Sequence, residues 1–421
     1  MKSSNDMHRV SMSIFILLLA ILVVNGCKST NREINTPKPI PKRNIFVWRT
    51  KQQCGPNTYF FGTVHVPIYK IWKPDTSRYG KRTWCIGSNC FVVTEVWQSI
   101  PEEIKILQNQ CDDVFTELPM DDHTAQLASD CFKMENGKNL SDILSPGMYS
   151  KVEAHIDYLR DEVPKLILKD DNLQYRLMEK RIPVETFSDF VTKNMHKLRP
   201  FSFIVQAELL RNPETVGVGL ERLLSQHFYW SGWSGKAGIE TVQEQCDAVN
   251  HINDMPEVIT LLGNWLTQME IIRKENLSIK SEISELVQSY SNGDAEAVEY
   301  LTQTAGSSFT YSIKDQDTPT YPMNETEKQA VKKIMEMVQQ KLLFNRNYVM
   351  GKRVVEIMRK RNNTIASGGT VLDACFVFGV GHFLGYASVL DYVRSQGFEL
   401  INVKTEAEIE NRMEKCNDTI K

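Results

Sequence analysis

Two short apolar runs near opposite ends of the chain each lead into a Gly-x-x-His motif. Residues 59–61 (Tyr-Phe-Phe) precede Gly62-Thr63-Val64-His65, and residues 375–378 (Cys-Phe-Val-Phe) precede Gly379-Val380-Gly381-His382. Aromatic and β-branched runs of this length are typical of buried strands. Each histidine is therefore expected to follow the carboxyl end of a strand.

The segments between these two strands have mostly helical spacing. Apolar residues recur at helical intervals in four stretches, residues 141–199, 220–228, 258–272 and 325–361. Strands at both ends with helices between them predict an α/β fold. We expect a mixed central β-sheet that joins the N- and C-terminal segments and is flanked by a helix-rich middle region.

Shorter signals extend this expected sheet. Residues 45–48 and 58–61 flank Gly55-Pro56-Asn57 and predict a β-hairpin. Residues 114–116 predict a strand that ends at Glu117. After the second motif we expect a helix over residues 385–396 and a last strand over residues 398–403.

Residues 73–95 differ from the segments around them. They contain Pro74, Gly80 and Gly87, together with the close pair Cys85 and Cys90. Proline and glycine at this density indicate a loop. We expect a loop-like insertion in which Cys85 and Cys90 form a local disulfide.

Length and composition favour one large folded unit. The chain has 421 residues, of which 42% are apolar and 24% charged, and no low-complexity linker divides it. The formal net charge is -3, and Lys and Arg are scattered rather than gathered in a stripe. A nucleic acid is therefore not an expected partner.

The first 26 residues have the layout of a secretory signal peptide. Lys2, His8 and Arg9 precede an apolar run over residues 14–24, and Asn25-Gly26-Cys27 follows it. The run is shorter than the about 20 apolar residues that span a membrane. We expect residues 1–26 to be removed, with an uncleaved anchor as the alternative.

The remaining chain is expected to comprise three parts. Residues 27–43 are polar and proline-rich and predict a flexible lead-in, residues 44–405 form the folded domain, and residues 406–421 form a charged tail. The tail has no hydrophobic anchor signal, so we expect a mature protein that is soluble and secreted, or held at the cell surface.

Cysteines and glycosylation signals agree with this route. Nine cysteines are present, and the eight after Cys27 are an even number compatible with disulfides in an oxidising compartment. Five Asn-x-Ser/Thr sequons predict a glycoprotein. They begin at Asn139, Asn276, Asn324, Asn362 and Asn417.

The ends of the predicted strands carry the candidate chemistry. Open α/β sheets place their ligand sites beyond the carboxyl ends of the strands. His65, His382 and Glu117 would there offer two imidazoles and a carboxylate, a donor set for a metal with an open coordination position. Such a metal suits Lewis-acid hydrolysis.

The sequence lacks the motifs of three other classes of protein, namely zinc peptidases, serine hydrolases and dinucleotide-binding proteins. His-Glu-x-x-His is absent, and Gly232-Trp233-Ser234-Gly235-Lys236 misses the Gly-x-Ser-x-Gly elbow at its last position. The glycines of residues 379–385 are spaced one residue too widely for a dinucleotide fingerprint. We therefore expect no nucleotide cofactor.

Four blocks, in order, resemble the TIKI metalloproteases, the animal branch of the TraB/PrgY family. The first is residues 59–67 (Tyr-Phe-Phe-Gly-Thr-Val-His-Val-Pro) with Ile71-Trp72. The others are residues 235–246, which end in Glu-Gln-Cys, residues 345–354 with Asn345-Arg346-Asn347, and residues 378–385. The resemblance covers roughly residues 44–405, and ordered agreement over separated blocks is more specific than any single motif.

This resemblance implies a Mn²⁺- or Co²⁺-dependent metalloendopeptidase that trims the N-terminus of Wnt proteins and thereby inhibits Wnt signalling. His65, His382 and Glu117 match the family's site residues and are the expected metal ligands. The Phe-Glu-Leu-Asp block departs from the family here, because it reads Thr116-Glu117-Leu118-Pro119 and lacks its second carboxylate. TIKI proteins are usually type I membrane proteins, whereas no C-terminal span is expected here.

Further site residues follow from the same blocks. Arg346 and Asn347 either orient a substrate carbonyl or stabilise an oxyanion, or they form a helix-surface pair. Glu240 either holds a ligating histidine in its tautomer or is a helix N-terminal acid. The blocks also suggest a disulfide between Cys131 and Cys246.

Two other functions stay open. The chain could be a binding protein that sequesters a secreted peptide signal without hydrolysing it, or a hydrolase in which His and Glu act as acid and base without a metal. Chelation followed by restoration of Mn²⁺ or Co²⁺ separates these alternatives from the metallopeptidase.

Overall fold

The computed structural model describes the greater part of the expected domain. It covers residues 46–51, 56–63, 71–74, 83–86, 89–93, 111, 113–119, 121–167, 183–211, 238–275, 282–303, 323–371 and 373–403. The expected signal peptide, lead-in and charged tail lie outside the described residues, as do His65 and the expected helix over residues 220–228.

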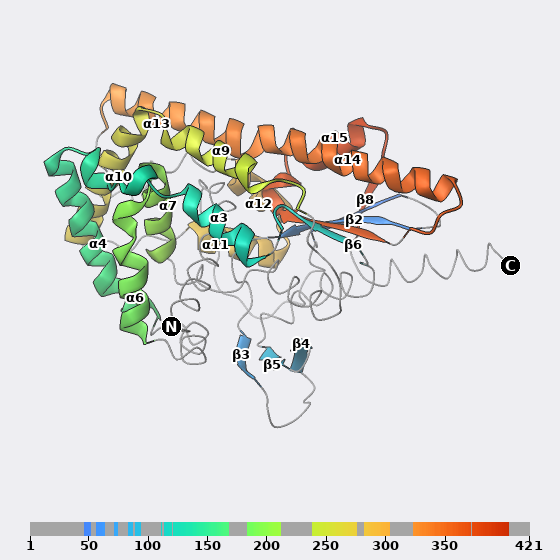
Figure 1. Ribbon diagram of the computed structural model, residues 1–421, viewed down its shortest axis with the longest axis horizontal. Coiled ribbons are helices and arrows are strands. Elements are labelled where there is room, and N and C mark those ends of the chain that lie inside the picture. Colours follow the sequence, from blue (N-terminus) through green and yellow to red (C-terminus); the bar gives the residue numbers. More distant parts are fainter. Residues whose placement is uncertain are drawn as a thin grey trace, which may run out of the picture.

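The central sheet contains strands from both ends of the chain (Figure 1). Its order is β6-β7-β2-β1-β8. The strands are β1 (Val47–Thr50), β2 (Thr58–Thr63), β6 (Asp113–Thr116), β7 (Ala374–Gly379) and β8 (Leu400–Asn402). β6, β7 and β2 run parallel, whereas β1 is antiparallel to β2 and β8. The mixed sheet and the hairpin predicted from the sequence are thus confirmed.

The middle strands are buried along their whole length. Every residue of β2 and β7 is buried, as continuous apolar runs covered on both faces should be. Phe376 stacks on Phe60 of β2 at 5.5 Å and on Phe115 of β6 at 5.1 Å. These cross-strand rings hold the three parallel strands in register.

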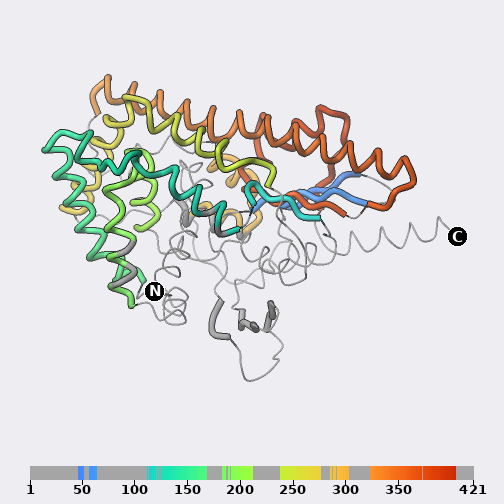
Figure 2. The backbone as a smooth tube through the Cα atoms, viewed as in Figure 1, coloured from blue at the N-terminus to red at the C-terminus, as the bar shows by residue number. Residues whose placement is uncertain are grey.

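Helices form most of the rest of the described fold. They are α3 (Asp122–Cys131), α4 (Pro146–Ile167), α6 (Val184–Lys193), α7 (Pro200–Arg211), α9 (Val242–Asn253), α10 (Glu257–Lys274), α11 (Glu282–Asn292), α12 (Ala295–Gln303), α13 (Glu325–Val338), α14 (Asn345–Ala366) and α15 (Val389–Ser395). Helices α4, α6, α7 and α10 pack together at one end of the molecule, called here the helical end. Figure 2 shows that the chain of α13 and α14 runs from this helical end to the sheet.

Helix α7 is the centre of the helical end. Nearly all of its residues are buried, which is typical of a helix surrounded by others. Its first turn is capped from α9, since Asn253 Oδ1 accepts from the backbone N–H groups of Phe201 at 3.0 Å and Ser202 at 3.4 Å. A neighbouring helix thus satisfies donors that the helix itself leaves unpaired.

Helix α15 begins later than the sequence predicts. Gly385 and Ala387 have φ values of 76° and 55°, outside the helical region. Ser388 then caps the helix, because its Oγ accepts from Asp391 N–H at 3.1 Å. The expected helix over residues 385–396 is therefore shortened to Val389–Ser395.

The expected loop over residues 73–95 is wrong in its secondary structure. The chain there forms a three-stranded antiparallel sheet of order β3-β5-β4, made of β3 (Ile71–Pro74), β5 (Asn89–Val93) and β4 (Thr83–Ile86). The β-branched and aromatic residues of β4 and β5 outweigh the glycines around them. The register places the Cα atoms of Cys85 and Cys90 opposite each other.

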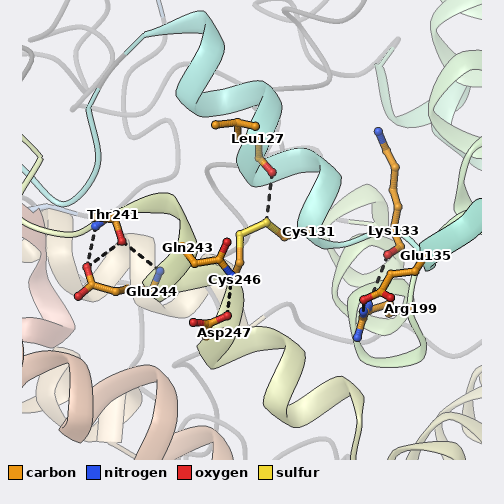
Figure 3. Close-up of a disulfide and its surroundings, with 10 residues drawn as sticks. All are labelled: Leu127, Cys131, Lys133, Glu135, Arg199, Thr241, Gln243, Glu244, Cys246 and Asp247. Carbon is orange, nitrogen blue, oxygen red and sulfur yellow. Dashed lines mark hydrogen bonds and ion pairs between the residues drawn. A yellow bond between two sulfur atoms is a disulfide. The ribbon is translucent and has the colours of Figure 1, made fainter.

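Two disulfides join distant parts of the described chain. Cys131 on α3 is bonded to Cys246 on α9 (Figure 3), the pair that the family blocks suggested. Cys111, which precedes β6, is bonded to Cys375 in β7. Such bonds are typical of proteins that fold in an oxidising compartment. Within the described residues, no helix combines the length and apolar character needed to cross a membrane.

Candidate functional site at the carboxyl ends of three parallel strands

The candidate site lies where three adjacent parallel strands end. In the register of the sheet, Thr63 at the end of β2 is opposite Gly379 at the end of β7, and Thr116 at the end of β6 is opposite Val377. Glu117 directly follows β6, and His382 closes the short 3₁₀ turn Val380–His382 that follows β7. The topology therefore brings Glu117 and His382 to the same edge of the sheet. The chain also leaves β2 at this edge, two residues before His65.

The second motif packs directly on the first. A Cβ placed on Gly62 would lie 2.9 Å from Val380 Cγ2 and 3.3 Å from Phe46 Cβ. Separations this short require the hydrogen that glycine carries in place of a side chain. Position 62 therefore requires a glycine, because Val380 of the second motif occupies the space that a side chain would fill.

Asn347 fixes the tautomer of His382. Its Nδ2 donates to the carbonyl of Ala387 at 3.1 Å, so its Oδ1 is the atom that faces His382 Nδ1, 2.6 Å away. Because an amide oxygen only accepts hydrogen bonds, the proton belongs on Nδ1. In the neutral imidazole the lone pair is then on Nε2, which lies 3.6 Å from Glu117 Oε1.

Among the described residues, two donors hold Glu117. Its Oε1 accepts the backbone N–H of Gly379 at 2.7 Å, and its Oε2 accepts from Arg346 Nη2 at 2.9 Å. The side chain is almost completely buried. The carboxylate that faces His382 is thus fixed both by the start of the second motif and by helix α14.

Arg346 also binds Glu240. Its Nε lies 3.0 Å from Glu240 Oε1, and its Nη2 lies 2.6 Å from Glu240 Oε2. Burial by itself lowers the pKa of Arg346, but the charges of Glu240 and Glu117 outweigh this effect and raise the pKa above its ordinary value. Arg346 therefore stays a cation, and the three side chains carry one negative charge in excess when both carboxylates are ionised.

A π-helical turn precedes Arg346. Residues Gln339–Phe344 form it between α13 and α14, and such turns are rare and frequently found at functional sites. Arg346 Nη1 donates to the carbonyl of Leu342, within this turn, at 3.3 Å. The turn thus supplies an additional acceptor for the buried guanidinium.

Helix α14 is tied to the segment that carries Glu240. Arg353 donates to the carbonyl of Ile239 at 2.7 Å and forms a two-point ion pair with Glu244 at 2.8 and 2.6 Å. Hydrogen bonding from Arg353 lowers the pKa of Glu244 to about 2. Glu244 in turn caps α9 by accepting from Thr241 N–H at 2.8 Å.

The short segment before α9 extends the sheet beside Glu117. Ile239 N–H donates to Thr116 O, and Glu240 N–H donates to Glu117 O, both at 2.8 Å. A Cβ on Gly238 would lie 2.3 Å from Pro119 Cδ. Pro119, the residue where the family block has Asp, therefore packs on Gly238, and this position supplies no second carboxylate.

The structure thus brings together five of the six predicted site residues. Glu117, His382, Asn347, Arg346 and Glu240 are all buried. Hydrogen bonds join Asn347 to His382 and Arg346 to both carboxylates, and His382 Nε2 lies 3.6 Å from Glu117 Oε1, whereas His65 lies outside the described residues. Sequence reasoning missed the amide of Gly379 and also Gln245, whose Nε2 donates to Glu240 Oε2 at 3.1 Å. Gln245 was visible as part of the Glu-Gln-Cys block.

His382 and Glu117 fit part of a metal site. Two donors on one ion lie about 3 to 3.5 Å apart at ordinary bond lengths, close to the 3.6 Å between His382 Nε2 and Glu117 Oε1. Among the described residues, no three or more His, Cys, Asp or Glu side chains gather into a metal-binding group.

Comparison with known proteins gives a consistent set of relatives. The chain is 25% identical over 413 residues to Metalloprotease TIKI1 of Danio rerio, which covers 94% of this chain and 71% of that protein. It is 24% identical over 410 residues to Metalloprotease TIKI homolog of Nematostella vectensis, covering 94% and 77%. Metalloprotease TIKI1 of Homo sapiens is 25% identical over 375 residues, covering 85% and 61%. No solved structure matches the chain.

The family assignment rests on a broader match. The model of the TraB/PrgY/gumN family matches residues 71–401, well over half of the 421 residues. This range includes Glu117, Glu240, Arg346, Asn347 and His382. The chain therefore belongs to the TraB/PrgY/gumN family.

Proposed function

We propose that this chain is a metal-dependent peptidase in which His382 and Glu117, together with His65, hold a divalent metal ion. The observation that carries the proposal is the orientation of His382. Asn347 keeps the proton on Nδ1 and leaves the lone pair on Nε2, 3.6 Å from a carboxylate oxygen. A nitrogen and an oxygen donor suit Mn²⁺ or Co²⁺, the metals proposed here.

The surrounding residues have separate roles in this proposal. When bound, the metal supplies Lewis-acid polarisation of a peptide carbonyl and a water of lowered pKa. Asn347 orients His382, and Arg346 orients Glu117 and limits the negative charge of the pair of carboxylates. Glu240 holds Arg346 and so acts on the site through it rather than on the substrate.

The proposed substrate is the N-terminal region of a Wnt-type secreted protein, whose trimming inhibits its signalling. The names of the curated relatives support a metalloprotease, and the resemblance of the sequence blocks supports the substrate. The two disulfides support a secretory route. We further propose glycosylation at Asn324 and Asn362, which are exposed in the structure, and at the other three sequons.

The test is cleavage of a purified Wnt protein, read by mass spectrometry of its N-terminus. The full chain is treated with chelator, after which Mn²⁺ or Co²⁺ is restored. We expect loss of N-terminal residues that stops with chelator and returns with metal. Cleavage that resists chelation would contradict the metal mechanism, and binding without any change in mass would favour sequestration.

Variants of two proposed ligands, with an exposed histidine as the control, test whether these residues form the active site. His382→Ala and Glu117→Gln should each reduce cleavage by more than about a hundredfold, because the first removes a nitrogen donor and the second replaces a charged carboxylate with a neutral amide that binds a divalent ion more weakly. His251→Ala is the control, since His251 is exposed on α9. Activity of His382→Ala equal to that of the control would refute the assignment of this site.

A further inference from the structure

Tyr290 connects helix α11 to the first Gly-x-x-His motif. Its hydroxyl donates to the carbonyl of Gly62 at 2.7 Å. The side chain is completely buried, and its ring stacks on Phe46 with centroids 4.7 Å apart. A residue that is distant in the sequence thus binds the backbone three residues before His65.

Gly62 is held on its other sides as well. Its N–H donates to the carbonyl of Phe46 at 2.8 Å, and Val380 of the second motif lies against its Cα. Beyond Gly62, the Thr63 hydroxyl donates to the carbonyl of Phe378 at 3.0 Å. The hydroxyl of Tyr290 therefore acts on the point where the two motifs touch and where β2 ends.

We propose that Tyr290 is a positioning residue for the site. Through the Gly62 carbonyl it sets the direction in which the chain leaves β2 toward His65, and it keeps Gly62 against Val380. Helix α11 is thereby part of the framework of the site, although no motif marks it. This inference deepens the proposed function and rests on it for its consequence in catalysis.

The chain offers a closely matched control. Thr192 on α6 is also completely buried, and its hydroxyl donates to a backbone carbonyl, that of Ser188, at 2.7 Å. Helix α6 lies at the end of the molecule away from the sheet (Figure 1). Tyr290→Phe and Thr192→Val thus each remove a buried hydroxyl that donates to a backbone carbonyl, one beside the site and one far from it, and Phe retains the ring that stacks on Phe46.

The variants are compared by three measurements on the full chain. Hydrogen–deuterium exchange follows a peptide over residues 59–66, visible absorption follows Co²⁺ binding, and Wnt cleavage gives kcat and KM. We expect a smaller loss of stability in Thr192→Val than in Tyr290→Phe, because the Thr192 hydrogen bond lies within one helix. Only Tyr290→Phe should raise exchange in the peptide, weaken Co²⁺ binding by about tenfold and lower kcat at unchanged KM, because it frees the backbone that leads to a proposed ligand.

The outcomes separate this proposal from the function on which it rests. If the wild-type chain binds no Co²⁺ and cleaves nothing, the proposed function fails, while the exchange comparison still decides the role of Tyr290. Faster exchange over residues 59–66 in Tyr290→Phe alone supports positioning. Exchange that changes no more than in Thr192→Val overturns it, and so does an unchanged Co²⁺ affinity in a chain whose wild type binds Co²⁺.

Discussion

At the scale of single residues, Arg346 has the most consequential environment. It is buried beside Glu117 and Glu240 and binds both carboxylates. A guanidinium is suited to this position, because its planar fork reaches two carboxylates at once and keeps its charge when buried. Removing it leaves two buried carboxylates without their shared cation.

Arg346→Met should therefore be strongly destabilising. We expect a loss of about 3 to 5 kcal/mol in the free energy of unfolding, the usual effect of deleting one member of a buried ion pair. Arg346→Lys retains a charge but loses the fork, so its loss should be smaller. Urea unfolding of both variants measures this order, and a loss below about 1 kcal/mol for Arg346→Met would show that the carboxylates do not depend on the guanidinium.

At the scale of elements, the helical end contains a histidine that is buried among aromatic side chains. His155 on α4 is completely buried, and neither ring nitrogen has a hydrogen-bond partner among the described residues. Its ring meets Trp265 of α10 at 4.7 Å and Phe203 of α7 at 6.5 Å. Burial, and then the charges of Arg273 and Arg211, hold its pKa well below 6.5.

This packing predicts acid sensitivity of the helical end. The folded state keeps His155 neutral, whereas the unfolded chain binds a proton near pH 6.5, so stability is highest above that pH and falls as the pH drops below it. Between pH 7 and pH 5.5 the contribution of His155 should fall by about 1 kcal/mol.

His155→Phe tests the prediction, because Phe suits the aromatic surroundings and does not titrate. Urea midpoints at pH 7 and pH 5.5 should lie closer together for this variant than for the wild type. His196, whose pKa is also lowered, by burial and then by Lys197, contributes equally to both proteins. An identical pH dependence in the two proteins would show that protonation of His155 does not destabilise the folded state.

At the scale of the whole molecule, the sequence predicted the sheet better than the connections around it. The apolar runs of β2 and β7 are buried on both faces, and burial of that kind leaves a local signal. The meeting of Glu117 and His382 was expected from the ends of their strands, whereas Asn347 was expected only through the family blocks, because its side chain reaches the site through tertiary packing. Tyr290 had no signal at all, since its role depends on a backbone carbonyl that any sequence would provide.

The disulfide between Cys111 and Cys375 shows the same limit. Cysteine spacing does not reveal connectivity, and the bond joins residues 264 positions apart. Cys375 lies in β7, and Cys111 lies two residues before β6, so the bond links the strand that leads to His382 with the strand that leads to Glu117. It therefore closes a long loop between two of the strands that lead to the site.

Replacing both Cys111 and Cys375 by alanine should lower the free energy of unfolding, while the central sheet still forms. A bond that closes a loop of this length restricts the unfolded chain, and its removal should cost about 2 to 4 kcal/mol. The Cys131→Ala/Cys246→Ala variant is the matched control, because its loop of 115 residues is also long but joins α3 to α9. Both variants should lower the urea midpoint, and only the first should also speed hydrogen exchange in β6 and β7. Equal exchange of these strands in the two variants would mean that the aromatic stack on Phe376, and not the disulfide, holds them together.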